Sequence, residues 1–74
     1  MGRKNKICFA DSQGNSLFQL PDGGMIKLCY GNGDENYAIC RYLDKDHAEI
    51  DGVPYALIDF AKRMEQNQIH FCPA

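Results

Sequence analysis

One segment of the chain has the periodicity of an amphipathic helix, and it limits what the other residues can form. The segment runs from Val53 to Asn67. Its apolar residues recur at the i, i+3, i+4 and i+7 spacing that places side chains on one face of a helix: Leu57, Phe60, Ala61 and Met64. Pro54 suits the first helical turn, where a missing N–H costs nothing, and Asn67 suits the C-terminal end. We therefore predict one helix over Val53–Asn67.

The residues before this helix have the pattern of short strands separated by turns. Alternation of apolar and polar side chains predicts strands at Lys6–Ala10, Ser16–Leu20, Met25–Tyr30, Tyr37–Leu43 and His47–Ile50. Runs rich in Asp, Asn, Gly and Pro predict the turns between them. Tyr37–Leu43 is apolar on both faces, which favours a central place in a sheet. Ile69–Cys72 is expected to add a last short strand.

Connections of hairpin length between these strands favour antiparallel pairing. The sequence therefore predicts an α+β fold: a small antiparallel β-meander of about five strands, followed by one amphipathic helix and a short C-terminal strand. A chain of 74 residues has room for one core, so residues 1–74 are expected to form a single small domain. Residues 1–5 are expected to be a flexible basic tail.

A mismatch in size follows from this prediction. About five strands at ~4.8 Å spacing span ~24 Å, whereas one helix is ~10 Å across. The sheet must therefore curl around the helix, or a second subunit must cover the remaining apolar face. A small chain without a stabilising metal or disulfide gains stability from association, so a homodimer is slightly favoured over a monomer.

Composition and charge exclude several classes of protein. Hydrophobic residues make up 45% of the chain, which is too many for a disordered chain. The formal net charge of −2 argues against a dedicated nucleic-acid binder. No apolar run has the length of a signal sequence or of a membrane span. We therefore expect a cytoplasmic protein that does not associate with a membrane.

The four cysteines indicate no metal site or disulfide framework. They stand at positions 8, 29, 40 and 72, and none forms a CxxC pair. They are expected to be reduced thiols that pack as small hydrophobes. His70 and Cys72 share one strand face, but two ligands define no site. The acidic run Asp44–Asp51 departs from a calcium-binding loop because Ala48 and Glu49 occupy its fifth and sixth positions. No metal and no cofactor are predicted.

Catalytic patterns are also lacking. His47 is the best general-base candidate because Asp44, Asp46 and Glu49 lie nearby in the sequence, but no nucleophile is positioned beside it. No GxSxG motif frames Ser12 or Ser16. The sequence therefore predicts a protein that is not an enzyme and that has no catalytic residue.

An ordered set of motifs resembles one of the large polyvalent protein-associated domain families of bacterial mobile elements. The motifs are Leu20-Pro21-Asp22-Gly23, then Arg41-Tyr42-Leu43-Asp44 with His47, and Asp59-Phe60-Ala61-x-x-Met64-Glu65. The resemblance covers Phe18 to Pro73. It implies an accessory protein of a conjugative element or phage of gut-type Gram-positive bacteria, with no catalytic residue. Relatives carry a histidine and a cysteine at the helix start, where this chain has Ala56 and Ile58.

Two hypotheses for function follow. The first is a non-enzymatic accessory module that binds a protein partner of unknown identity through the uncovered sheet face, with Tyr37 and Tyr42 as anchors beside Arg41 and Lys27. The alternative is a nucleic-acid-binding accessory factor of the same element. Folding would then gather five basic residues onto one face: Arg3, Lys4, Lys6, Lys27 and Arg41.

Overall fold

Antiparallel strands and a single helix make up the fold, as the alternating and helical periodicities predict. The structure is a computed structural model that describes residues 5–74, so the predicted tail over residues 1–5 lies, apart from Asn5, outside the described residues. The elements in chain order are β1 (Lys6–Ala10), β2 (Ser16–Pro21), β3 (Met25–Cys29), β4 (Glu35–Asp44), β5 (His47–Ile50), β6 (Val53–Ala56), α1 (Leu57–Gln66) and β7 (His70–Pro73). The α+β class is therefore confirmed.

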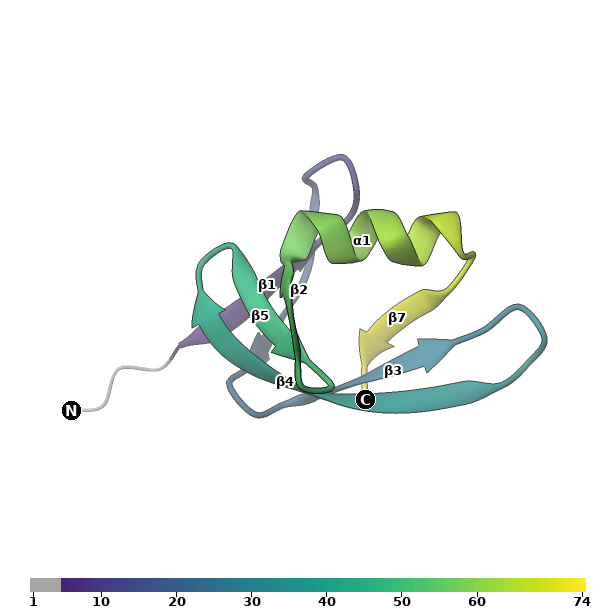
Figure 1. Cartoon of the computed structure of the whole chain (residues 1–74), viewed down its shortest axis with the longest axis horizontal. Helices are drawn as coiled ribbons and strands as arrows, with labels where there is room; N and C mark the ends of the chain where they lie inside the picture. The colour runs from purple at the N-terminus through teal and green to yellow at the C-terminus, as the bar shows by residue number, and fades with distance from the viewer. Residues whose placement is uncertain (1–4) are drawn as a thin grey trace.

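The strands divide into two sheets (Figure 1). Five of them form one sheet in the order β6-β5-β4-β3-β7, and β1 pairs only with β2 in a separate hairpin. Strand β4 is central in the larger sheet, as predicted from its two apolar faces. The turn after β2 explains the division. Gly23 has a φ of +83° and donates its N–H to the Cys40 carbonyl at 2.8 Å, so the chain turns toward β4 before β3 begins.

The start of the helix differs from the prediction. Val53–Ala56 is strand β6, and α1 begins at Leu57 rather than at Val53. Asp51 and Gly52 both have positive φ, at 55° and 81°, which is the conformation of a two-residue hairpin turn. They return the chain alongside β5 instead of ending the sheet. Pro54 therefore lies in an edge strand, where a residue without an N–H is tolerated.

The helix buries the face that its periodicity predicts. Its buried residues are Leu57, Phe60, Ala61 and Met64. Asn67 is the C-terminal cap, and the following Gln68 adopts the left-handed conformation with φ 57°. The N–H of Gln68 then donates to the Glu65 carbonyl and that of Ile69 to the Met64 carbonyl, both near 3 Å. This bonding pattern ends the helix and directs the chain into β7.

The core lies between the inner face of the larger sheet, the helix and the first hairpin. Phe9 of β1 packs with rings from the other end of the chain: its centroid lies 6.2 Å from that of Phe60 and 5.7 Å from that of Phe71. Ser12, in the β1–β2 turn, donates its hydroxyl to Glu65 at 2.7 Å and so fastens the hairpin to α1. The helix and the first hairpin thus cover the inner face together. The part of the sheet that is too wide for one helix is therefore covered on that face within one chain.

Candidate functional site: the outer face of the sheet

The outer face of the larger sheet carries apolar side chains that nothing in the described chain covers. Met25, Tyr37 and Ile39 are 42%, 55% and 50% exposed. Met25 of β3 pairs directly with Ile39 of β4, and Lys27 pairs with Tyr37. Cross-strand partners point to the same side of a sheet, so these side chains are neighbours. We call the set formed by Met25, Lys27, Tyr37, Ile39, Arg41 and Glu49 the outer patch.

Charges of both signs border the apolar residues of the outer patch. The Lys27 ammonium lies 3.8 Å from the Glu35 carboxylate across the β3–β4 pair. Arg41 of β4 stands opposite Glu49 of β5 in the register of those strands. Because Lys27 and Arg41 each have an acidic neighbour, the outer patch together with the bordering Glu35 has no excess of either charge. An apolar centre with charges at its border is the usual composition of a protein–protein interface.

The outer patch is also slightly hollowed. Six side chains and one glycine surround a shallow depression of about 430 Å³: Met25, Tyr37, Ile39, Arg41, Glu49, Asp51 and Gly52. Asp51 and Gly52 form the β5–β6 turn and contribute to the lining of the depression. A depression with an apolar floor is suited to a protruding side chain of a partner.

The structure unites three of the four residues predicted for the interaction surface and separates the fourth. Tyr37, Arg41 and Lys27 lie in the outer patch. Tyr42 lies on the opposite face of β4, where it packs against the core, and its backbone N–H donates to Asp22 at 2.8 Å. The reason is the alternation of side chains in a strand: Tyr42 lies five positions after Tyr37, and an odd offset places two residues on opposite faces.

Sequence reasoning missed Met25, Ile39 and Glu49 as members of the outer patch. The alternation alone could have placed Ile39 beside Tyr37 and Arg41, since all three occupy odd positions in β4. Met25 and Glu49 depend on the register of β3 and β5 against β4. That register is fixed by turn geometry and by burial on the inner face, which single-strand patterns do not reveal.

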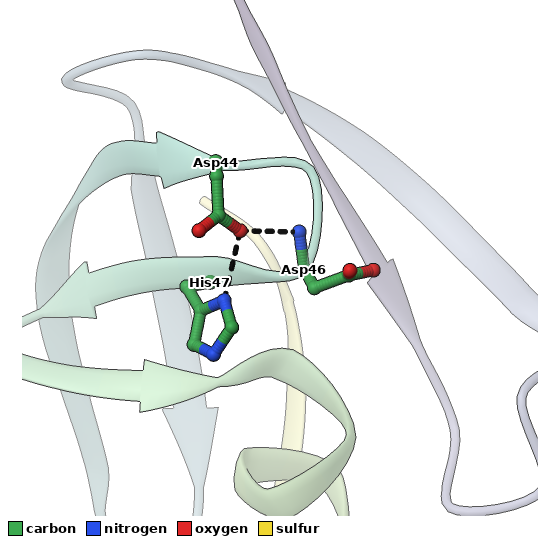
Figure 2. Close-up of polar contacts among 3 residues, drawn as sticks. All are labelled: Asp44, Asp46 and His47. Carbon is green, nitrogen blue, oxygen red and sulfur yellow. Dashed lines mark hydrogen bonds and ion pairs between the residues drawn. The ribbon is translucent and has the colours of Figure 1, made fainter.

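His47, the general-base candidate, is held in an exposed turn (Figure 2). Its Nδ1 lies 2.8 Å from Oδ1 of Asp44, and the backbone N–H of Asp46 donates to the same oxygen at 2.8 Å. The hydrogen bond that the Asp44 carboxylate accepts from the His47 ring raises the pKa of His47 and lowers the pKa of Asp44. The carboxylate thus bonds to two groups of the β4–β5 turn, an arrangement typical of turn stabilisation.

The thiols have contrasting environments. Cys40 is fully buried on the inner face of β4, and burial raises the pKa of its thiol to about 11, whereas Cys8 is exposed on β1. All four thiols are free. His70 and Cys72 share one face of β7, as their spacing indicates, and Cys29 pairs with His70. Among residues 5–74, however, no three His, Cys, Asp or Glu side chains are arranged to hold a metal ion.

Comparisons with known proteins leave the site to be interpreted from its own chemistry. No family model matches the chain, and searches of curated proteins and of solved structures also give no match. Within the described part of the chain, no helix has the length and apolar character needed to cross a membrane. Burial, charge and strand geometry are therefore the observations from which a function can be proposed.

Proposed function

We propose that this protein is a non-enzymatic interaction module that binds a protein partner through the outer patch. The observation that carries the proposal is the contiguous exposure of Met25, Tyr37 and Ile39 on two hydrogen-bonded strands. Contiguous exposed apolar residues with a charged border mark interaction sites more often than isolated ones do. Tyrosine, methionine and arginine are also the residue types enriched at the centres of interfaces.

A non-enzymatic role is supported by the position of His47. Its ring nitrogen bonds to Asp44 within an exposed hairpin turn, and half of its side chain faces solvent. A general base acts on a substrate held in a site that restricts water. The β4–β5 turn offers His47 no such enclosure, so we assign it to the stability of the turn.

The resemblance to domains of bacterial mobile elements supports a role as an accessory protein of such an element. Its motifs coincide with structural features: Leu20-Pro21-Asp22-Gly23 spans the end of β2 and the turn after it, and Phe60, Ala61 and Met64 lie on the buried face of α1. Recovery of the gene beside a relaxase, an integrase or a conjugation operon would support this part of the proposal. A neighbourhood of housekeeping genes would count against it.

The nucleic-acid alternative has less support from the outer patch. Lys27 is paired with Glu35, and Arg41 stands opposite Glu49, so the basic groups there do not form a continuous positive surface. Arg3 and Lys4 lie outside the described residues. A gel shift with single- and double-stranded DNA at low salt tests the alternative. A shift that weakens steeply with added salt would favour it over the protein-partner proposal.

The main proposal is tested by affinity capture with matched surface variants. Ile39→Glu places a charge in the centre of the outer patch, and Leu17→Glu places the same charge on β2, where Leu17 has a similar exposure of 49%. A partner captured from a bacterial host that carries the element should be lost with Ile39→Glu. It should be retained with Leu17→Glu.

Folding of both variants is verified by urea denaturation before capture is compared. Loss of the partner with both variants, or retention with both, would contradict the assignment of the outer patch. A host extract that yields no partner with the wild-type chain under mild conditions would also count against the proposal.

A second copy of the chain is one partner that the outer patch could bind. The outer patch holds Lys27, Arg41 and Glu49, and Glu35 borders it, so two copies related by a two-fold axis could place bases against acids. Light scattering over a hundredfold range of concentration tests this partner. Mass that rises toward twice that of the monomer, and that falls back with Ile39→Glu, is the expected result. A constant monomer mass would exclude the homodimer.

A further inference from the structure

A second surface lies apart from the outer patch, between strand β6 and helix α1. The two elements join without a loop and form a corner, which Figure 1 shows where the strand meets the start of the helix. The corner borders an open groove of about 710 Å³. One wall is the whole of β6, and the other is a stripe of α1 at helical spacing: Asp59, Lys62, Arg63 and Gln66.

The β6 wall is an open sheet edge, because β6 is the last strand on its side of the sheet. Residues of an antiparallel pair alternate between those that bond across the pair and those whose N–H and C=O point away. The N–H of Leu57 donates to the Asp46 carbonyl at 2.8 Å. Bonded positions recur at every second residue, so the other residues of β6 that bond to β5 are Tyr55 and Val53. The backbone groups of Pro54 and Ala56 therefore point to the open edge.

Only two backbone groups of this edge remain for a ligand. Pro54 has no N–H and contributes its carbonyl. Ala56 is the N-terminal cap of the helix, so its carbonyl accepts the first helical hydrogen bond. Its N–H remains free to donate to a ligand. The Pro54 carbonyl and the Ala56 N–H flank Tyr55, which is the spacing that one added strand uses for a pair of bonds. A longer ladder is prevented by Pro54.

The helical wall supplies an excess of positive charge. Among the described residues, Lys62 and Arg63 take part in no ion pair. Asp59 is the one acidic residue lining the groove, and it lies in the first turn of α1, where the helix N-terminus stabilises its charge. A ligand that pairs with β6 and carries carboxylates toward α1 would therefore meet two unpaired cations.

We propose that the groove between β6 and α1 binds a short extended peptide segment with acidic side chains. The segment adds to the β6 edge through the Pro54 carbonyl and the Ala56 N–H, and its carboxylates bind Lys62 and Arg63. Two backbone bonds give little affinity by themselves, so the charged contacts contribute a large share and binding weakens as salt is added. The site is independent of the outer patch.

The binding test uses a blocked hexapeptide of alternating valine and glutamate, with the valine–lysine peptide of the same length as its control. Titration is followed by the amide resonances of the isotopically labelled chain. Saturable shifts centred on Ala56, Lys62 and Arg63 with the acidic peptide alone are the expected result. Equal shifts with the lysine peptide, shifts centred on Ile39, or no saturable shift would overturn the proposal.

One substitution that introduces a proline and one that removes a proline test the backbone hydrogen bonds between β6 and the peptide. Ala56→Pro removes the edge N–H, and the φ of −71° at Ala56 already suits proline after a residue in a strand. Binding of the peptide should weaken by about threefold to tenfold, which corresponds to the contribution of one hydrogen bond to affinity. Pro54→Ala restores a donor at the edge and should tighten binding by a similar factor. Unchanged binding by both variants, with folding intact, would exclude strand addition.

A charge reversal tests the contribution of the helical wall to peptide binding. The double variant Lys62→Glu with Arg63→Glu should reduce binding of the acidic peptide by more than about tenfold. The control is Lys6→Glu with Lys45→Glu, which changes the net charge equally at exposed positions outside the groove. Equal losses in both double variants would mean that net charge alone attracts the peptide, and the groove would carry no specific site.

Discussion

Strand β4 carries apolar side chains on both faces, and the two faces differ in burial. On the inner face, Ala38 is 4% exposed and Cys40 is fully buried. On the outer face, Tyr37 and Ile39 keep about half of their surface in solvent. Burial stabilises a fold in proportion to the apolar area removed from water, so most of this contribution comes from the inner face. Substitution of the outer apolar residues should therefore affect the stability of the fold less than substitution of the inner ones.

The largest difference is expected between two neighbouring positions of β4 given the same charge. Ala38→Glu places a carboxylate in the core against Ile26, and should reduce the free energy of unfolding by at least about 3 kcal/mol. For a chain of this length the total free energy of unfolding is roughly 4–11 kcal/mol, so this substitution should remove a large share of it. Ile39→Glu should change the free energy by only about 0.5–1 kcal/mol.

Urea denaturation followed by circular dichroism measures both variants. Similar midpoints for Ala38→Glu and Ile39→Glu would mean that the two faces of β4 do not differ in burial as described.

A smaller difference is expected between the two tyrosines of β4. Tyr42 packs partly against the core, so Tyr42→Ala should reduce the free energy of unfolding by about 1–2 kcal/mol. Tyr37 is 55% exposed, so Tyr37→Ala should change it by no more than about 0.5 kcal/mol. Partner capture should follow the reverse order, because only Tyr37 lies in the outer patch. If Tyr37→Ala destabilised the protein more than Tyr42→Ala in the same urea measurement, the assignment of the two tyrosines to their faces would be wrong.

The smallest effect is expected at the β4–β5 turn and depends on pH. The pKa of His47 is raised above 6.5 by Asp44, so its contribution to stability is complete below that pH and is lost as pH rises through the folded-state pKa. The pKa of Asp44 is lowered below 3.8, so its contribution is present above that pH and is lost as pH falls through its folded-state value.

The His47 contribution is measured as the change in urea midpoint between about pH 5.5 and about pH 8.5. The wild-type midpoint should fall more over this interval than that of His47→Gln, which keeps a polar side chain without the titration. Parallel changes in the two proteins would show that the pair with Asp44 does not contribute to stability.

The sequence predicts most of the local structure because its turns and apolar periodicities are explicit. Ile7 and Phe9 alternate as expected, and the four buried residues of α1 follow the helical spacing. Strand β6 was missed because Pro54 suits an edge strand as well as a first helical turn, and the choice depends on the conformation of Asp51-Gly52. The separate β1–β2 sheet depends on contacts between distant residues, which local patterns do not encode.

Prediction of the site was partial for a related reason. Residues in one strand, such as Tyr37 and Arg41, could be assigned to one face by counting positions, and Tyr42 could have been excluded in the same way. The groove between β6 and α1 does not follow from the sequence, because the pattern of Val53–Ala56 predicts the start of a helix rather than a strand. Its helical wall was visible only as polar residues off the buried face.

The packing of Phe9 against Phe60 and Phe71 has a consequence for the nascent chain. At typical rates of translation of about 5–20 residues per second, roughly 3–12 s separate the synthesis of Phe9 from that of Phe71. During that interval Ile7, Phe9 and Leu20 lack the partners that bury them. The core therefore cannot be completed until Phe71 has been synthesised, and until then the apolar face of the first hairpin lacks its core partners.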